Sequence, residues 1–309
     1  MKSIFIHIGY HKTASTYLQK HFFPKLPVNF IFLKDKKIKD LLQSRKFKKK
    51  TFLNWLKRKI KKKYGSKNYS LTIISQEQLS GHAHGNKKIN PKIVAQNLKT
   101  AFPRAKILIV IRNQLDYLLS IYAYRIAVKG YEIRSLNQFL KEEGKQGLFK
   151  KLEYDRLVKE YLTLFTKKNV LLLPMEMLKN SPQQFQQKIT DFIDLPFFPL
   201  KTKIVNPSTN LKQVINFWRP INRSFKRFLS LLRKLKIKTN NNYQALRFAF
   251  YWLKQKTTPF LNLIFSFSNK LCLTTYPQYQ KMKKRFKTSN QKLEKLTNLD
   301  LKKYSYPLD

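Results

Sequence analysis

The chain has 309 residues, of which 42% are hydrophobic and 14% aromatic, and only 7 are glycine. This composition supports a large hydrophobic core and excludes an intrinsically disordered chain. The single cysteine excludes an intramolecular disulfide, and 64 Lys and Arg against 16 Asp and Glu give a net charge of +48, which attracts nucleic acid, anionic lipid or acidic glycan.

The N-terminal segment does not predict a secretory signal. Its apolar run covers about five residues and leads into a polar loop, whereas a signal sequence needs about 7–15 apolar residues. No segment reaches the roughly 20 apolar residues of a membrane-spanning helix. We therefore expect a cytoplasmic protein, with peripheral contact to the inner face of the membrane as an open option.

Five short apolar runs predict β-strands, at 3–8, 28–33, 69–75, 105–111 and 169–174. The run at 105–111 is apolar at almost every position, as expected for a strand covered on both faces. Helical patterns lie between and after the runs, at 15–23, 40–63, 91–101, 115–128, 135–143, 153–166 and 182–193. This alternation predicts an α/β fold with a central parallel sheet of about five strands, flanked by helices.

Basic amphipathic helices follow residue 199, where strand patterns end. No Asp or Glu occurs between 195 and 293, and Pro220 is expected to divide one long pattern into two helices. We therefore expect a core at 1–210, a basic helical region at 211–285 that faces the acceptor or a membrane, and a C-terminal helix and tail at 286–309 that pack on the core. The earlier segment 45–63 holds eleven basic residues, which suit either a solvated helix face or a polyanion contact.

The first predicted strand runs into the polar loop Gly9-Tyr10-His11-Lys12-Thr13-Ala14-Ser15-Thr16, and a helix follows. The start of a helix presents free N–H groups and a positive dipole end, which together favour an anion. Lys12 adds a positive charge, and Thr13, Ser15 and Thr16 add hydroxyl donors. The order of residues differs from the Walker A motif, which needs a Gly-Lys-Ser/Thr run. The loop thus indicates a phosphate site, and an ordinary capped turn with a solvated lysine is the alternative.

A second strand–helix unit carries Arg112 at the end of the strand at 105–111, and Ser120 eight residues later. Arginine at a strand end can bind phosphate through paired N–H donors. Ser120 lies about two turns into the next helix, so it reaches the same phosphate only if that helix packs across the strand end.

Together the two units resemble the PAPS-dependent sulfotransferases, a P-loop-like family, in its bacterial type. HIGYHKTASTYLQ resembles the family's 5′-phosphosulfate loop, K-T-G-T-T, and IRNQLDYLLSIY resembles its 3′-phosphate motif, R-N-P-x-x-x-x-x-S. The stretches LLPMEMLKNSPQQFQQKITDFIDLP and SNQKLEKLTNLDLKKYSYP are also similar to bacterial members. The resemblance touches residues from about 4 to 307, although most of 211–280 matches nothing specific.

The chain departs from the family pattern at two positions. Ala14 stands where glycine is usual, and Gln114 stands where proline is usual. Alanine disfavours left-handed backbone geometry, so we expect a slightly altered loop. Ser15 in place of threonine keeps the hydroxyl.

The resemblance implies a sulfuryl transfer from PAPS to a hydroxyl or amine, with no metal. It assigns Lys12 to the charge that develops on the departing bridging oxygen. It places Arg112 and Ser120 on the 3′-phosphate. Thr13, Ala14, Ser15 and Thr16 are expected to hold the 5′-phosphate, and Gly9 and Lys12 are also expected to bind the nucleotide. Ser208, in Asn206-Pro207-Ser208, is expected near the nucleotide, unless this segment is only a turn.

The proton acceptor is left open among an acid and several histidines. Glu77 follows the third predicted strand and is the first candidate, although it also suits a helix cap. His11, His82 and His84 compete with it, and the spacing of the last two would also suit a metal pair, for which no third ligand is evident. His7 lies on an apolar strand and is expected in the core.

The acceptor is expected to be a carbohydrate or glycolipid hydroxyl, because the family commonly modifies such groups. Two other functions remain as alternatives. A basic nucleic-acid-binding protein would use the charge and the aromatic residues of 211–285, but no nucleic-acid motif is evident. A small-molecule kinase of P-loop type would need the Walker pair and a Mg²⁺ carboxylate that the sequence does not offer.

Overall fold

The computed structural model describes residues 3–65, 67, 69–81, 89–127, 134–197, 199–200, 218–234, 249–250, 252 and 277–308. The chain forms two compact units. The first unit comprises Met1–Gln114, Glu143–Val205 and Met282–Asp309, and the second comprises Leu115–Glu142 and Asn206–Lys281. The expected division at residues 210 and 285 stays a prediction.

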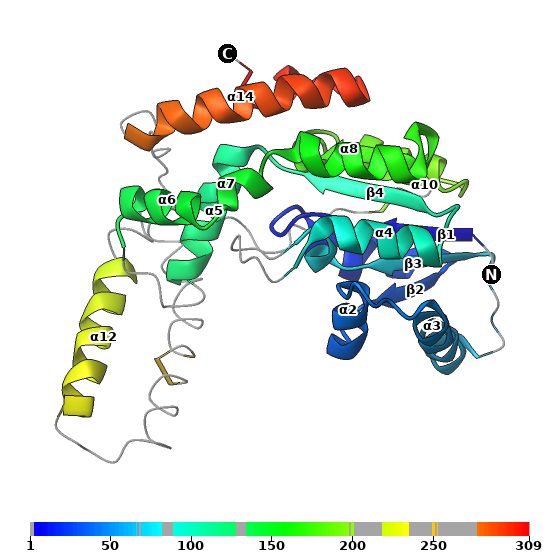
Figure 1. Cartoon of the computed structure of the whole chain (residues 1–309), viewed down its shortest axis with the longest axis horizontal. Helices are drawn as coiled ribbons and strands as arrows, with labels where there is room; N and C mark the ends of the chain where they lie inside the picture. The colour runs from blue at the N-terminus through cyan, green and yellow to red at the C-terminus, as the bar shows by residue number, and fades with distance from the viewer. Residues whose placement is uncertain are drawn as a thin grey trace. The chain divides into compact units, whose positions relative to one another are not determined.

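The first unit contains a five-stranded sheet (Figure 1). Its strands are β1 (Ser3–His7), β2 (Asn29–Phe32), β3 (Leu71–Ser75), β4 (Lys106–Ile111) and β5 (Val170–Pro174). The order is β2-β3-β1-β4-β5 and every pair is parallel. β1 lies in the middle, with Ile6 opposite Ile74 on one side and Ile107 on the other, and all three side chains are fully buried. The predicted α/β class and parallel sheet are confirmed.

Helices and turns of the first unit flank this sheet. They are α1 (Ser15–Tyr17), η1 (Leu18–Phe22), η2 (Phe23–Lys25), α2 (Lys36–Leu42), α3 (Lys49–Tyr64), η3 (Glu77–Ser80), α4 (Pro91–Ala101), α7 (Leu148–Lys151), α8 (Tyr154–Phe165), η4 (Lys167–Asn169), α9 (Met175–Asn180), α10 (Pro182–Phe192), most of α14 (Pro277–Thr297) and η7 (Lys302–Tyr304). Their apolar faces contribute Leu98, Val158 and Ile189 to the core, each fully buried.

The single helix predicted at 40–63 is wrong, because the structure has two helices there. Asp35 caps α2 by accepting a hydrogen bond from the Ile38 N–H at 3.4 Å. At the other end, the Asn97 side chain donates to the Leu42 and Ser44 carbonyls, both at 2.9 Å. These bonds hold the chain in a turn after Leu42, so a new helix starts only at Lys49.

The helix predicted at 15–23 is also only partly correct. Regular α-helix covers Ser15–Tyr17, and the chain then widens into the π-helix Leu18–Phe22. Pro24 does not end this segment but lies inside the 3₁₀ turn Phe23–Lys25, where its missing N–H costs no hydrogen bond. Phe22 and Phe23 are fully buried, so core packing determines the local geometry.

The second unit contains most of α5 (Gln114–Ala127), part of α6 (Leu136–Lys145), and α12 (Arg219–Lys234). The Asn222 side chain donates to the Ile126 carbonyl at 3.2 Å, which ties α12 to α5. Pro220 lies in the first turn of α12, and its expected role in dividing two helices stays a prediction. The preceding residues 201–217 lie outside the described part.

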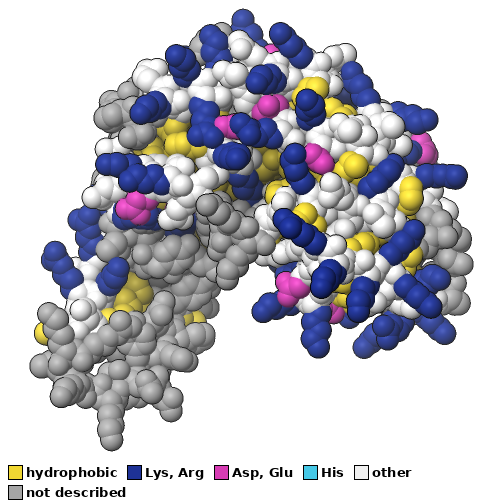
Figure 2. All heavy atoms as spheres, viewed as in Figure 1, with side chains coloured by type: hydrophobic (Ala, Val, Ile, Leu, Met, Phe, Trp, Pro, Cys, Tyr) yellow, Lys and Arg dark blue, Asp and Glu magenta, His cyan; other side chains and the backbone are white. Residues whose placement is uncertain are grey.

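Basic side chains dominate the visible surface, where Lys and Arg far outnumber Asp and Glu (Figure 2). Despite the abundant apolar residues, no helix within the described ranges is long and apolar enough to cross a membrane.

Candidate functional site

The candidate site lies at the carboxyl end of the sheet, where the loops after β1 and β4 meet. After β1 the chain continues to β2 and β3 on one side of it, whereas after β4 it continues to β5 on the opposite side. The order of strands therefore changes direction between β1 and β4, which makes this place a topological switch point. Open parallel sheets bind ligands at such points. The Ile8 and Tyr10 N–H groups extend the pairing beyond β1, donating to the Leu108 and Val110 carbonyls at 3.0 and 3.4 Å.

The loop after β1 alternates between left- and right-handed backbone. Lys12 and Ala14 have φ of 62° and 59°, whereas Thr13 and Ser15 are not in the positive-φ region. Alternation of this kind can turn successive N–H groups to one side, as in concave anion sites. Ala14 thus has the left-handed conformation that alanine disfavours, and the expectation of a slightly altered loop stays a prediction. The hydrogen bonds around Ala14 offset the free-energy cost of its left-handed backbone.

Those bonds converge on the carbonyl of Tyr10. The Thr13 hydroxyl donates to it over a short distance, and the Ser15 hydroxyl does so at 3.4 Å. Both side chains are buried, and that of Thr16 is half-buried. In this structure the first two hydroxyls thus close the loop internally rather than pointing outward as donors for an anion.

Gly9 is required by the close approach of a histidine. A Cβ atom added at Gly9 would lie 2.5 Å from the His7 Nε2 atom, which is closer than real side chains allow. His7 is fully buried, and its Nδ1 lies 2.8 Å from the Ser75 hydroxyl. Burial lowers the pKa of His7 to about 3, so the ring is neutral. His7 is a core residue, as predicted.

Arg112 joins the second strand end to this loop. Its Nη1 atom donates to the Lys12 carbonyl at 3.2 Å, and its own carbonyl accepts from the Tyr154 hydroxyl at 2.7 Å. The side chain is 9% exposed, and within the described residues its Nε atom has no hydrogen-bond partner. A buried guanidinium with a spare donor suits an anionic ligand.

Two cations therefore lie at one edge of the sheet. Burial and the nearby charge of Arg112 both lower the pKa of Lys12, with burial the larger cause. An anion bound between them would relieve the repulsion and satisfy the free donor. The residues present thus fit a ligand with phosphate groups, and the fit rests on the buried Arg112 and the concave loop.

Glu77 opens the short helix η3 directly after β3. The Gln19 side chain donates to its carboxylate at 2.9 Å and to the Ser75 hydroxyl at 3.1 Å. The cap of η3 is Gln76, whose side-chain oxygen accepts from the Gln78 N–H at 3.2 Å, so Glu77 is not the capping residue. The Ser80 hydroxyl donates to the Gly9 carbonyl at 3.3 Å and links η3 to the loop.

Gln19 is a site residue that sequence reasoning missed. It lies in the π-helix η1, and its partners Ser75 and Glu77 are more than fifty residues away in the chain. Its neighbours Lys20 and His21 are polar too, so the local sequence gives no signal of these distant partners.

The remaining predicted site residues are half-buried or lie outside the described part of the chain. His11 is half-buried within the loop, and Ser120 is half-buried on α5 in the second unit. His82, His84 and Ser208 lie outside the described residues. In the described ranges no group of three or more His, Cys, Asp or Glu side chains could hold a metal ion.

Lys151 was not predicted, yet it lies against the loop. Its ammonium group donates to the Gly81 carbonyl at 3.0 Å and lies 5.5 Å from the centre of the Tyr10 ring. Tyr10 also packs edge-on against Tyr154, with 4.7 Å between ring centres. Burial lowers the pKa of Lys151 to about 7. These contacts connect the end of η3 with the loop after β1.

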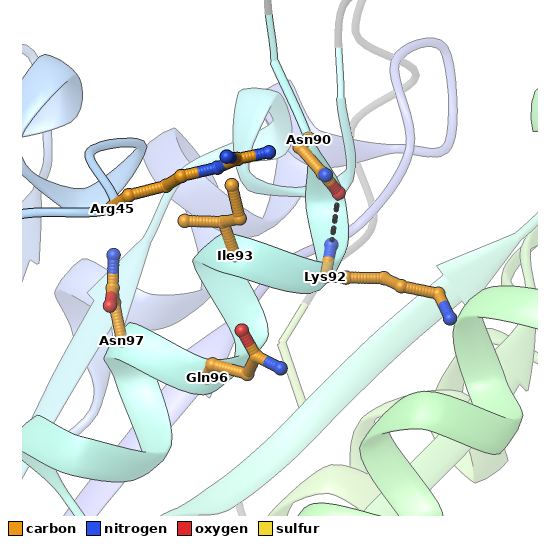
Figure 3. Close-up of a pocket in the computed structure, with 6 residues that line it drawn as sticks. All are labelled: Arg45, Asn90, Lys92, Ile93, Gln96 and Asn97. Carbon is orange, nitrogen blue, oxygen red and sulfur yellow. Dashed lines mark hydrogen bonds between the residues drawn. The ribbon is translucent and has the colours of Figure 1, made fainter.

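A pocket at the start of α4 is lined by other residues (Figure 3). Those residues are Arg45, Asn90, Lys92, Ile93, Gln96 and Asn97. The Asn90 side chain already caps α4 by accepting from the Lys92 N–H at 3.0 Å, and both bonds of Asn97 stabilise the preceding turn. The two asparagines of this pocket thus stabilise the fold, and we assign no ligand to the pocket.

Comparison with known proteins identifies one family. A model of the sulfotransferase domain family matches residues 2–218. A search of curated proteins found no match.

Solved structures also show likenesses, all at low identity. A sulfotransferase from Alicyclobacillus acidocaldarius is 16% identical with a TM-score of 0.49, over 75% of this chain and 96% of that one. Mouse sulfotransferase SULT7A1, complexed with PAP, is 18% identical with a TM-score of 0.36, over 70% and 64%. A sulfotransferase domain from the curacin biosynthetic pathway is 14% identical with a TM-score of 0.36, over 64% and 75%.

The left-handed Ala14 yields a stability prediction. Ala14→Gly should raise the free energy of unfolding by about 1 kcal/mol, because glycine adopts this conformation without a Cβ clash. Urea unfolding measures the change. Ala101→Gly, at the end of α4, is the matched control and should lower stability by about the same amount. A loss of stability in Ala14→Gly would contradict the left-handed assignment.

Lys151 yields a prediction of pH dependence. Its folded pKa is about 7 and its ordinary value is 10.5. Between these values the unfolded chain holds the proton and the folded chain does not, so stability rises with pH. Below about pH 7, Lys151 is charged in both the folded and the unfolded chain, so the full cost of burying its charge remains. Wild type should therefore gain stability relative to Lys151→Met between pH 6.5 and 9, measured by urea unfolding. A difference that is independent of pH would contradict the shifted pKa.

Proposed function

Because the chain belongs to the sulfotransferase family, whose members transfer a sulfuryl group from PAPS, we propose that it sulfates a hydroxyl or amine of a carbohydrate or glycolipid. The observation that carries the assignment of its nucleotide site is the bond from the Arg112 guanidinium to the Lys12 carbonyl at the ends of β4 and β1. Kinase or nucleic-acid chemistry would not require a second phosphate clamp on a neighbouring strand end.

The two cations would divide the nucleotide's phosphates between them. The N–H groups of residues 12–16 and the Lys12 ammonium would bind the 5′-phosphosulfate, and Arg112 would bind the 3′-phosphate. Gly9 lets the chain turn sharply against His7. Ser120 and Ser208 are proposed as further ligands of the nucleotide.

The reaction is a displacement at sulfur. The acceptor oxygen or nitrogen forms a bond to sulfur while the bond from sulfur to the bridging phosphate oxygen breaks, leaving PAP and the sulfated acceptor. Lys12 stabilises the negative charge on the departing oxygen. Glu77 takes the acceptor's proton, and Gln19 orients it through the bond to the carboxylate. His11 is the second candidate for this proton transfer.

The site assignment predicts distinct losses from single substitutions. Arg112→Ala should weaken PAP binding about 100-fold and AMP binding little, because only PAP carries the 3′-phosphate. Isothermal titration calorimetry with both nucleotides measures this. Lys20→Ala, which removes an exposed charge shortly after the loop that follows β1, is the control. Equal losses for PAP and AMP would refute the role given to Arg112.

Measurements of turnover test the roles proposed for Lys12, Glu77 and His11. Lys12→Ala should lower kcat about 100- to 1,000-fold, and Glu77→Gln should lower kcat while PAP affinity stays unchanged. Release of PAP from PAPS, with glycan and glycolipid acceptors, provides the assay. If Glu77→Gln retains full turnover and a His11 variant does not, the base is His11.

The acceptor proposal includes contact with an anionic membrane through α12. Phe228 and Leu231 are 47% and 55% exposed on this helix, next to the exposed Arg223 and Arg227. Exposed apolar residues beside a row of basic ones favour the interface of an anionic bilayer. On α3, by contrast, the apolar Phe52 and Leu56 are fully buried, and the exposed residues are mostly Lys and Arg. The proposed cytoplasmic location at the membrane's inner face follows from this contact.

Vesicle flotation tests the membrane contact. Phe228→Ser/Leu231→Ser should lose most binding to phosphatidylserine vesicles, because insertion of apolar side chains adds to charge attraction. Lys57→Gln/Lys61→Gln on α3 removes two exposed charges and should reduce binding only slightly. No loss of binding in Phe228→Ser/Leu231→Ser would show that charge alone drives binding, and no binding by wild type would end the proposal.

A further inference from the structure

The C-terminal tail, residues 301–307, lies against the strand end that carries Arg112. Its path is fixed where it leaves α14, because the Glu294 carboxylate accepts from the Leu301 N–H at 2.8 Å. Leu301, Tyr304 and Tyr306 are buried. The tail is therefore a packed part of the first unit.

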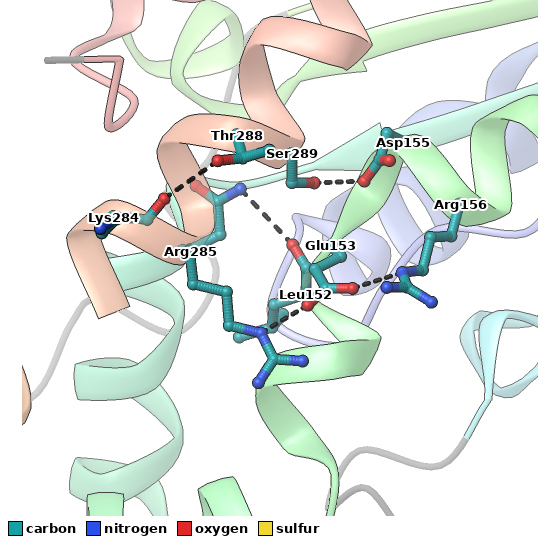
Figure 4. Close-up of polar contacts among 9 residues, drawn as sticks. Leu152, Glu153, Asp155, Arg156, Lys284, Arg285, Thr288 and Ser289 are labelled. Carbon is teal, nitrogen blue, oxygen red and sulfur yellow. Dashed lines mark hydrogen bonds and ion pairs between the residues drawn. The ribbon is translucent and has the colours of Figure 1, made fainter. Parts of the chain in front are cut away.

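The helix that leads into the tail is itself held by polar contacts to α8. Glu153 forms ion pairs with Arg285 from α14 and with Arg156 from α8 (Figure 4). The Ser289 hydroxyl donates to the Asp155 carboxylate nearby. Because Tyr154 lies between these acids and donates to the Arg112 carbonyl, the same segment contacts both α14 and the site.

Asn113, the residue next to Arg112, is bound on two sides. Its N–H donates to the Glu176 carboxylate at 3.0 Å, and its side chain donates to the Ser305 carbonyl at 2.6 Å. The Tyr306 hydroxyl donates to the other oxygen of Glu176 at 3.0 Å. One buried carboxylate thus bridges the tail and the backbone of the strand end.

Gln114 forms a second link. Its side-chain amide exchanges two hydrogen bonds with that of Asn290, at 2.6 and 3.3 Å, and Asn290 also donates to the Pro307 carbonyl at 2.8 Å. Gln114 and Asn290 are both completely buried. The glutamine that replaces the family's usual proline therefore connects the strand end to α14 and the tail.

We propose that the C-terminal tail positions Arg112 for the 3′-phosphate of the nucleotide, acting through Glu176, Asn113 and the Gln114–Asn290 pair. The inference rests on the proposed role of Arg112. Asn113 and Gln114 follow Arg112 directly, so bonds to these two residues fix the backbone from which the guanidinium projects. On the other side, Tyr154 fixes the Arg112 carbonyl. The tail residues are positioning residues and need not touch the ligand.

Glu176 is suited to this part because it is buried and fully engaged. Burial raises its pKa, while its bonds to Asn113 and Tyr306 and the charge of Arg112 act in the opposite direction. Removing one of these donors leaves a buried carboxylate oxygen unsatisfied, which favours a shift of the surrounding backbone.

The experiment compares PAP and AMP binding to full-length variants by calorimetry. Tyr306→Phe should reduce PAP affinity about tenfold and leave AMP affinity within about twofold, because only the 3′-phosphate contact depends on Arg112. Tyr304→Phe is the matched control, since this buried tail tyrosine donates no hydrogen bond to Glu176, and it should leave both affinities unchanged. Asn113→Ala, which removes the bond to Ser305, should repeat the selective loss if Tyr306→Phe does not fold.

The outcomes separate the two proposals. If Arg112→Ala lowers the PAP-to-AMP affinity ratio but neither Tyr306→Phe nor Asn113→Ala does, the tail does not position the arginine. If the tail variants weaken PAP and AMP equally, their effect is general destabilisation and the inference is overturned. If Arg112→Ala leaves the ratio unchanged, the proposed 3′-phosphate site fails and the inference fails with it.

Discussion

The site depends on two positive charges held side by side at the end of a buried sheet. Lys12 and Arg112 come from loops after neighbouring strands, and the guanidinium of one donates to the carbonyl of the other. Placing like charges together in a partly desolvated site is unfavourable, as the lowered pKa of Lys12 shows. The surrounding fold must therefore hold both groups in place. β1 and β4 do so through backbone pairing, and the bonds to the Tyr10, Arg112 and Asn113 main chain do so at the loops.

The strands could be predicted because their signal is local. A parallel sheet covered on both faces requires continuous apolar runs, and all five runs became strands within two residues of the expected limits. The loop and Arg112 could be located for the same reason, since each directly follows such a run. The break between α2 and α3 could not, because the amide of Asn97, more than fifty residues away, determines it.

Side-chain pairs across the chain were the least predictable part of the site. Gln19 reaches Glu77, and Gln114 reaches Asn290, over separations of 58 and 176 residues. An amide in isolation carries no information about its partner. The local structure at the two positions that depart from the family motif could not be predicted from the sequence either. Ala14 has a left-handed backbone that its residue type disfavours, and Gln114 has a partner that proline could not bind.

Carboxylates are scarce in this chain, so the contacts that each one makes are informative. Against 64 basic residues there are 16 acids, and several described ones form ion pairs, as Glu153 and Asp194 do. Glu77 forms no ion pair within the described part of the chain, and its carboxylate is held by the neutral amide of Gln19. An adjacent cation would lower the proton affinity of a carboxylate, whereas an amide fixes its direction at a smaller cost. A carboxylate held in this way suits the proton-accepting role proposed for Glu77.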